Sequence, residues 1–445
     1  MDPISRRRFA QSGLAHCAGL GLLAGLPPWA AAQSAPASAT QWAASWAGAP
    51  LDYLPLPIFP GLPAPPAERL SFGGQSLRQR MVSTLGGSLV RVRFSNLFGR
   101  QPLHVVEASV ALSTGAEAVS PASLQRLRFG GRAVLTIAPG QEAWSDGTKL
   151  DVAAGQAVAV SYQVQAGTPF ATRHLLATTS TVPGAAVMRA DWRGAMPSQV
   201  NHVVTGLDVA ARAAPRVIVA FGDSITQGAA GVSQESYPDR LAARLRDMPK
   251  SNGNGNGDAN ANANGNVGHG GFAVINAGIG GNRLLLDGTG PRALDRFKRD
   301  ALGQSGVTHV LVLIGINDIG VSLPVPIQAL SPTFRPATVE QLTAGLQQLI
   351  DQARQRGVKL LLGTITPFKG AAYWSEEKEV RRQALNRWIR GRQEVDGVID
   401  FDEALRDPAD PSAMRAACDS GDHLHPGPAG YAAMADAIDL RELRE

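Results

Sequence analysis

The stretch that decides the fold is Val217-Ile-Val-Ala-Phe-Gly-Asp-Ser-Ile-Thr226, near the middle of a chain of 445 residues. Its first half, Val217 to Phe221, is an uninterrupted apolar run, which is typical of a strand buried on both faces. The run ends at Gly222-Asp223-Ser224, and a helical pattern follows over residues 237–246. A serine at such a junction lies near the carboxyl edge of a sheet, where open α/β proteins bind ligands. Ser224 is therefore a candidate nucleophile, although a turn serine would occupy the same place.

Strand and helix patterns alternate throughout residues 216–445. The expected strands are Val217–Phe221, Phe272–Asn276, His309–Ile314, Lys359–Ile365 and Val398–Phe401. The expected helices are 237–246, 338–357, 376–392 and 427–440, and the second of these begins with the capping box Thr338–Gln341 and ends at Gly357. This alternation predicts a parallel sheet covered on both faces, that is, a three-layer α/β/α sandwich.

Residues 40–213 show a different pattern, with short runs rich in valine separated by Gly and Pro clusters. The expected strands here include 88–94, 105–112, 133–137 and 157–164. Regularly spaced short strands without helical periodicity predict an all-β domain, either a sandwich or a jelly roll. The segment 251–271, by contrast, consists largely of Asn, Gly and Ala, and we expect it to form a flexible, solvated insertion in the second domain.

The N-terminus has the features of an export signal. Ser5-Arg6-Arg7-Arg8-Phe9 resembles the twin-arginine motif, an apolar stretch follows over 13–26, and Ala30-Ala31-Ala32 resembles a cleavage site. We therefore expect a signal peptide over residues 1–32, export by the twin-arginine machinery to the periplasm or beyond, and no membrane span after cleavage near Ala32. Of the two cysteines, Cys17 would leave with this peptide, so the mature chain would contain no internal disulfide.

The charge pattern argues against nucleic acid as a partner. The formal net charge is +5, and part of it lies in the Arg6–Arg8 cluster of the expected signal peptide. No basic stripe with interleaved aromatic residues occurs in the sequence, whereas nucleic-acid-binding proteins commonly have one.

A nucleophilic serine needs a base, and the best candidate lies in Asp422-His423-Leu424-His425, before the last expected helix. The spacing of three residues can place the Asp422 carboxylate against the His425 imidazole and so fix its tautomer. Two alternatives remain for this segment: His423 and His425 could be two ligands of a metal site, or the loop could be purely structural.

Two further strand ends offer hydrogen-bond donors. Asn276-Ala-Gly-Ile-Gly-Gly-Asn282 follows the second expected strand, and Gly315-Ile-Asn-Asp318 follows the third. The first can present a backbone N–H at a glycine, and the second can present the side-chain amide of Asn317. Together they could form an oxyanion hole, although each alone would be an ordinary turn.

These four segments, in this order, resemble the four sequence blocks of the SGNH (GDSL-type) hydrolases, and the resemblance covers about residues 216 to 440. It implies a flavodoxin-like α/β/α sandwich in which Ser224 is the nucleophile, His425 the general base and Asp422 its orienting carboxylate. It also implies an oxyanion hole formed by the N–H groups of Ser224 and Gly281 and by the Asn317 side chain. Gly280 remains a lesser alternative to Gly281. The chain lacks the Gly-x-Ser-x-Gly elbow of ordinary α/β-hydrolases, since Thr226 stands where the second glycine would be.

The N-terminal region resembles exported bacterial esterases of the same superfamily that carry a leading β-sandwich. The resemblance rests on Trp42-Ala-Ala-Ser-Trp46 and the strand-rich stretch behind it. Some such proteins act on acetylated polysaccharides. Trp46, Tyr53 and Phe59 could accordingly line a platform for sugars, but packing inside the β domain is the better interpretation of these aromatic residues.

The sequence thus predicts a serine carboxylester hydrolase that works through an acyl-enzyme and needs neither metal nor organic cofactor. Its substrate would be a small-molecule or polysaccharide ester, for example an acetylated glycan. Two alternatives stay open. The chain could be a lipase, lysophospholipase or thioesterase acting on acyl chains, or a non-catalytic glycan-binding surface protein.

Overall fold

The computed structural model describes most of the chain after residue 39. The described ranges are 40–52, 73–198, 200–211, 214–228, 235–248, 271–320 and 336–444. The expected signal peptide, Tyr53, Phe59 and almost all of the expected insertion at 251–271 lie outside these ranges. No helix within them is long and apolar enough to cross a membrane.

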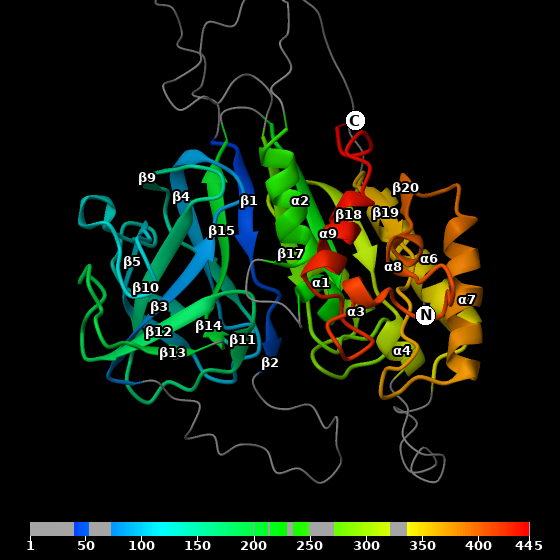
Figure 1. Ribbon diagram of the computed structural model, residues 1–445. Helices are drawn as coiled ribbons and strands as arrows, with labels where there is room; N and C mark the ends of the chain where they lie inside the picture. The colour runs from blue at the N-terminus through cyan, green and yellow to red at the C-terminus, as the bar shows by residue number, and fades with distance from the viewer. Residues whose placement is uncertain are drawn as a thin grey trace, which may run out of the picture. The chain divides into compact units, whose positions relative to one another are not determined.

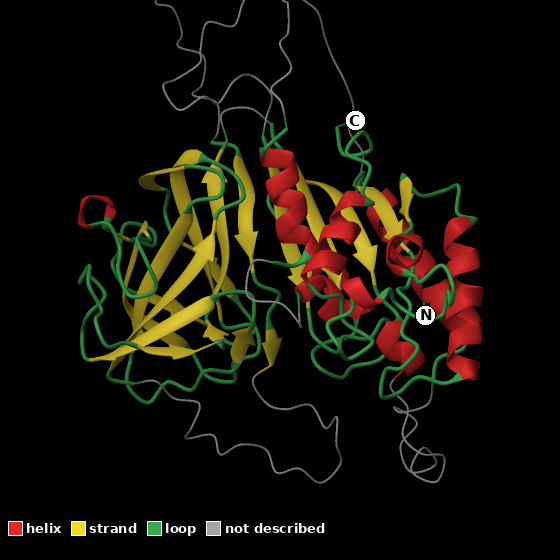
Figure 2. Ribbon diagram, in the orientation of Figure 1, coloured by secondary structure: helices red, strands yellow, loops and turns green. Residues whose placement is uncertain are grey.

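A five-stranded parallel sheet forms the centre of the C-terminal half (Figures 1 and 2). Its strands are β16 (Arg216–Gly222), β17 (Phe272–Gly278), β18 (Val307–Leu313), β19 (Lys359–Gly363) and β20 (Gly397–Ile399). They lie side by side in the order β17-β16-β18-β19-β20, which is the order 2-1-3-4-5 of flavodoxin-like folds. The predicted parallel sheet is confirmed, and the run Val217 to Phe221 that predicted its central part is completely buried.

Helices connect these strands. They are α1 (Ser224–Gln227), α2 (Tyr237–Arg246), α3 (Ala293–Asp300), α4 (Ile316–Gly320), α6 (Val339–Gln355), α7 (Glu376–Arg390), α8 (Phe401–Leu405) and α9 (Pro428–Asp436). In one group α2 packs on α9, and in the other α6 packs on α3 and α7, as the two outer layers of a sandwich require.

Local sequence signals explain the clearest of these helices. In α6, Thr338 Oγ1 accepts from the Gln341 N–H at 3.3 Å and Gln341 Oε1 accepts from the Thr338 N–H at 3.0 Å, so the predicted capping box is present. Gly357, with φ at 68°, follows the end of this helix. The predicted helix 237–246 is confirmed as α2, but the sequence did not predict α1, which begins at Ser224 itself. The prediction was also too long for the last helix, which ends at Asp436.

The N-terminal half is strand-rich, as predicted. Its strands are β1 (Trp42–Ala47), β2 (Leu51–Asp52), β3 (Gln75–Val82), β4 (Gly87–Ser95), β5 (Leu103–Leu112), β6 (Gln125–Arg126), β7 (Leu135–Ile137), β8 (Glu142–Trp144), β9 (Thr148–Val152), β10 (Ala157–Val164), β11 (Thr172–His174), β12 (Thr178–Pro183), β13 (Met196–Ser198), β14 (Asn201–His202) and β15 (Val204–Ala210). One antiparallel sheet has the order β1-β15-β4-β8, with β9 beside β4, and a second has the order β13-β12-β3-β10-β5-β6, with β7 beside β5. A small third sheet joins β14, β11 and β2.

The strand-rich and α/β regions are parts of one compact unit that begins at Thr40. One hydrophobic cluster runs from Ala43 in β1 through the parallel sheet to the last helix. Polar contacts join the regions as well: the Ala44 N–H donates to Ser305 O at 2.9 Å, and the Val274 N–H donates to Thr84 Oγ1 at 3.2 Å. The sequence marks a change of composition near Pro215, but the core continues across that point.

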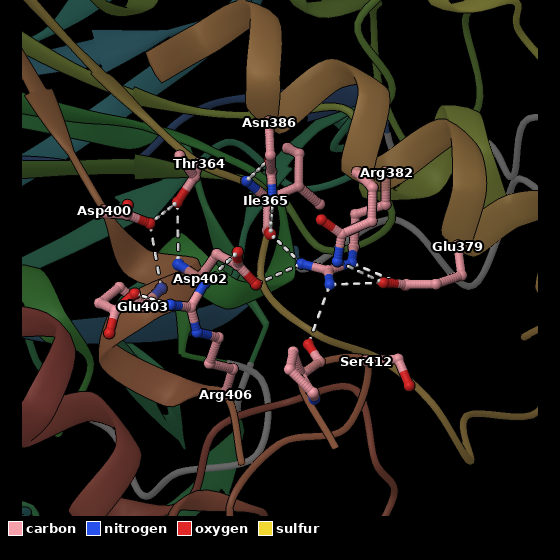
Figure 3. Close-up of polar contacts among 12 residues, drawn as sticks. Thr364, Ile365, Glu379, Arg382, Asn386, Asp400, Asp402, Glu403, Arg406 and Ser412 are labelled. Atoms are coloured by element: carbon pink, nitrogen blue, oxygen red, sulfur yellow. Dashed lines mark hydrogen bonds and ion pairs between the residues drawn. The ribbon is translucent and has the colours of Figure 1, made fainter. Parts of the chain in front are cut away.

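A buried ionic network connects the carboxyl end of β19 to α7 and α8 (Figure 3). Asp402 of α8 is 1% exposed and accepts from Arg382 of α7 at 2.5 Å and from Arg390 at 2.6 Å. Arg382 also donates to Ile365 O at 2.9 Å, and Asn386 bonds both the N–H and the carbonyl of Ile365. The residues just beyond β19 are therefore tied to α7 and α8.

Replacing Asp402 with alanine should lower the free energy of unfolding by about 3 kcal/mol, because the Arg382 guanidinium would stay buried with fewer carboxylate partners. Chemical denaturation measures this change. The matched control is Glu403→Ala, which removes an exposed pair with Arg406 on the same helix. We expect it to cost less than about 1 kcal/mol. Equal losses in the two variants would contradict a special role for the buried network.

Candidate active site

Ser224 lies where β16 meets α1. Gly222 ends the strand, and the Asp223 carboxylate caps α1 by accepting from the Ile225 N–H at 3.0 Å. A Cβ on Gly222 would lie 2.2 Å from Thr226 Oγ1 and 2.3 Å from Leu313 O, so only glycine fits the turn. The serine is 8% exposed at the carboxyl edge of the sheet.

The structure brings Ser224, His425 and Asp422 into one hydrogen-bonded chain. His425 Nε2 is 2.8 Å from Ser224 Oγ, and His425 Nδ1 is 2.6 Å from Asp422 Oδ2. The other carboxylate oxygen of Asp422 accepts from the N–H groups of Leu424 at 3.0 Å and His425 at 2.8 Å. A hydroxyl, an imidazole and a carboxylate in this sequence are the arrangement that activates a serine.

The loop that carries His425 is fixed by its own backbone. The Ser420 N–H donates to His425 O at 3.0 Å, and the Gly427 N–H donates to Cys418 O at 2.7 Å. His423 adopts a φ of 61° and places its Nδ1 2.6 Å from Asp419 Oδ2, away from the serine. Since both ring nitrogens of His425 are already engaged, this arrangement does not favour the alternative of a metal site on the two histidines.

The Asp422 carboxylate is held in its charged form. Partial burial acts to raise its pKa, but hydrogen bonds from the His425 side chain and from the His425 and Leu424 N–H groups outweigh burial and hold the pKa well below its usual range. An ionised carboxylate here keeps the Nδ1–H tautomer of His425, so that Nε2 can accept the serine proton.

The predicted donors lie just beyond the ends of β17 and β18, the strands on either side of β16. Asn317, at the start of α4, is 5% exposed, and its amide donates to Asn282 O at 3.0 Å, which fixes the orientation of the amide. The Gly280 N–H is occupied, since it donates to Gln227 Oε1 at 2.5 Å. Among the described residues the N–H of Gly281 has no acceptor. The geometry therefore favours Gly281 over Gly280 as a donor to a ligand.

The sequence analysis did not identify Arg296, whose hydrogen bonds connect the end of β16 to the segment that follows β17. This residue of α3 is completely buried and donates to four groups: Gly222 O at 2.7 Å, Ala277 O at 2.8 Å, Asn282 Oδ1 at 2.8 Å and, within its own helix, Asp300 Oδ2 at 3.3 Å. The only signal in the sequence is an arginine on the buried face of a short helix, and such a signal does not identify the carbonyls that the arginine will meet.

Two buried acids also had no role in the sequence analysis. Asp318 accepts from the Leu284 N–H at 2.7 Å and the Leu285 N–H at 3.0 Å, and burial raises its pKa to about 6. Burial likewise raises the pKa of Asp223 to about 7; the hydrogen bond from Ile225 lowers it, and the charge of Asp318 raises it again. Asp223 Oδ2 has no hydrogen-bond partner within the described part of the chain.

Trp46 of the strand-rich region and two other histidines, His174 of β11 and His309 of β18, are buried away from solvent. His174 is 1% exposed and its Nε2 is 2.8 Å from Val204 O, while the Trp46 ring packs 5.4 Å from the His174 ring. Trp46 is thus an interior residue, as the packing interpretation predicted. His309 is buried as well, with its Nδ1 2.8 Å from Thr308 Oγ1.

Residues 220–433, which contain all four blocks, match the GDSL-like lipase/acylhydrolase family. The α/β domain belongs to the SGNH (GDSL-type) hydrolases. The protein is accordingly a hydrolase of ester bonds, and the edge of the GDSL domain at which Ser224 lies is its candidate active site.

Solved structures of similar proteins include a GDSL-like lipase from Bacteroides thetaiotaomicron, with 16% identity, coverage of 52% of this chain and 91% of that chain, and a TM-score of 0.34. They also include an acetyl xylan esterase from Geobacillus stearothermophilus, with 20% identity, coverage of 51% of this chain and 94% of that chain, and a TM-score of 0.37. No curated protein matches the chain.

The raised pKa of Asp223 makes stability depend on pH. Between about pH 4 and pH 7 the folded state holds a proton on Asp223 that the unfolded state has lost, so the free energy of unfolding falls as pH rises through this window. Asp223→Asn keeps the capping oxygen and removes the titration. Chemical denaturation at pH 5 and pH 8 gives the free energy of unfolding of the variant minus that of the parent. We expect this difference to be more positive at pH 8 than at pH 5 by at least about 1 kcal/mol. Parallel pH profiles would contradict the burial of an ionisable Asp223.

Proposed function

We propose that the GDSL domain is a serine carboxylesterase in which Ser224 is the nucleophile, His425 the general base and Asp422 the orienting carboxylate. The observation that carries the proposal is the continuous chain of hydrogen bonds, 2.8 Å from Ser224 Oγ to His425 Nε2 and 2.6 Å from His425 Nδ1 to Asp422 Oδ2. No metal or organic cofactor takes part in this chemistry.

The reaction proceeds in two halves. His425 Nε2 takes the Ser224 proton as Oγ attacks the ester carbonyl carbon, and the resulting imidazolium then gives that proton to the departing alcohol. In the second half His425 removes a proton from water, the hydroxide attacks the acyl-enzyme, and the acid leaves as Ser224 recovers its proton. The Asp422 carboxylate stabilises the imidazolium in both halves.

The charge on the carbonyl oxygen is stabilised in the proposed oxyanion hole. Its three donors are the N–H of Ser224, the N–H of Gly281 and the side-chain amide of Asn317. The second and third are oriented before substrate binds. The Gly280 N–H, next to Gly281, donates to Gln227 Oε1 at 2.5 Å, and the Asn317 amide donates one of its hydrogens to Asn282 O at 3.0 Å. Preorganised donors of this kind are worth about 10²–10³ each in kcat.

The proposal extends to location and substrate. The twin-arginine-like segment 5–9 and the Ala30–Ala32 cleavage site support export and processing near residue 32. An exported esterase with a strand-rich region before the GDSL domain is suited to an acetylated or otherwise acylated glycan. This substrate class rests on architecture rather than on contacts.

A second candidate function is hydrolysis of longer acyl chains. A groove of about 610 Å³ lies between α3 and α6, and Leu285, Leu286, Leu294 and Ala337 provide its apolar lining. Leu285 follows Asn282 by only three residues, and the Leu285 N–H donates to the Asp318 carboxylate. The groove therefore begins close to the segment that carries the proposed oxyanion donors.

Replacing Ser224 with alanine should reduce kcat for p-nitrophenyl acetate by about 10⁴-fold or more, because no other group can form the acyl-enzyme. The thermal melting curve should be unchanged. A fluorophosphonate probe should label the parent protein and not the variant. Turnover that survives in the variant would refute the assignment, and absence of labelling in the parent would favour the non-catalytic glycan-binding alternative.

A series of p-nitrophenyl esters from acetate to octanoate tests the substrate class. We expect the highest kcat/KM for acetate, and we expect Ala344→Trp, which fills the exposed side of the groove, to change neither acetate nor octanoate turnover. A preference for octanoate that Ala344→Trp reverses would instead assign the groove to the acyl chain.

A further inference from the structure

Two adjacent backbone N–H groups, those of Gly280 and Gly281, lie beside Ser224, and the structure distinguishes them. A Cβ built on Gly280 would lie 3.9 Å from the Cβ of Ser224, so this loop passes directly over the nucleophile. The Gly280 N–H is taken by Gln227 Oε1 at 2.5 Å. The Gly281 N–H, at a residue with φ of 72°, has no acceptor in the described ranges.

Gln227 is rigidly connected to the nucleophile. It is the last residue of α1, the four-residue helix that Ser224 begins, and its own N–H donates to Asp223 O at 2.9 Å. A Cβ on Gly278 would lie only 2.3 Å from the Gln227 backbone nitrogen, so α1 and the glycine loop touch through their main chains. Gln227 therefore contacts the loop twice, through its backbone at Gly278 and through its side chain at Gly280.

The strand-rich region holds the same loop from the other side. Ile279, the residue before Gly280, is 2% exposed and forms a small apolar cluster with Ala49 at 5% and Leu51 at 4%. A Cβ on Gly290 would lie 2.6 Å from Leu51 Cδ2 and 3.5 Å from Ile279 Cγ2, which shows how closely these groups pack. Ala49 lies between β1 and β2 and Leu51 begins β2, so both belong to the region that precedes the GDSL domain.

We propose that Gln227 and Leu51 are positioning residues of the oxyanion hole. Gln227 accepts the Gly280 N–H, so that the Gly281 N–H is the one that donates to the substrate carbonyl oxygen. Leu51 packs against Ile279 and so maintains the position of the loop. The inference rests on the proposed function, in which Gly281 is an oxyanion donor. It gives the strand-rich region a part in catalysis by packing, independent of any glycan that region binds.

The first test is Gln227→Met, which keeps the length of the side chain and removes the acceptor. We expect kcat for p-nitrophenyl acetate to fall about 10- to 100-fold, as for displaced groups in other active sites. We expect KM to change less than about threefold, since the donor acts chiefly on the transition state. The matched control is Thr84→Val, which also deprives a backbone N–H, that of Val274 in β17, of its side-chain acceptor. It should lower the melting temperature to a similar extent and leave kcat within about twofold of the parent.

The second test is Leu51→Ala, which removes the packing of Leu51 against Ile279. It should lower kcat several-fold, again with KM little changed. It also serves as the deciding variant if Gln227→Met fails to fold. The inference is overturned if both positioning variants retain parental kcat, or if Thr84→Val loses as much kcat as they do. Failure of the proposed function is a separate result, since it requires that Ser224→Ala remain active.

Discussion

The active edge of this protein depends on the close approach of its backbones at the carboxyl ends of three neighbouring strands. Gly222 pairs in register with Gly278 of β17 on one side and with Leu313 of β18 on the other. A side chain on Gly222 would come within 2.3 Å of Leu313 O, and one on Gly278 would come within 2.3 Å of the Gln227 nitrogen. Because neither position holds a Cβ, the short helix beginning at Ser224 can lie directly against the loop that carries the proposed oxyanion donor Gly281.

This close approach buries backbone carbonyl and N–H groups, and buried ionisable side chains form the hydrogen bonds that these groups need. Arg296 donates to the carbonyls of Gly222 and Ala277, to the Asn282 side chain and to Asp300. Asp318 accepts from the Leu284 and Leu285 N–H groups. Charges removed from water are costly unless their hydrogen bonds are complete. The same burial raises the pKa values of Asp223 and Asp318. Burial therefore favours the neutral forms of Asp223 and Asp318, while Asp422, whose side chain is half-exposed, keeps its charge.

Local patterns predicted the elements with strong periodicity and missed those without it. The five apolar runs of the parallel sheet and the capping box at Thr338 each have a signal contained in a few adjacent residues. Helix α1 has four residues, too few to show a helical period, so the sequence placed the first helix at Tyr237. The change in composition near Pro215 suggested two separate domains, yet Leu51 packs on Ile279 of the other half. Burial between distant segments leaves no local pattern.

The sequence by itself determined which chemical groups stand at the strand ends: Ser224, the two glycines, Asn317 and the Asp422–His425 pair. The ends of the strands and the four short blocks are each encoded by a few adjacent residues, so they can be recognised in the sequence without coordinates. Only the tertiary structure decided how these groups are arranged relative to one another. It placed His425 Nε2 2.8 Å from the serine, and it paired the Gly280 N–H with Gln227 while the Gly281 N–H meets no acceptor among the described residues. Two glycines carry no side chain that could distinguish them in a sequence, whereas the direction of a backbone N–H depends on contacts from segments far away in the chain.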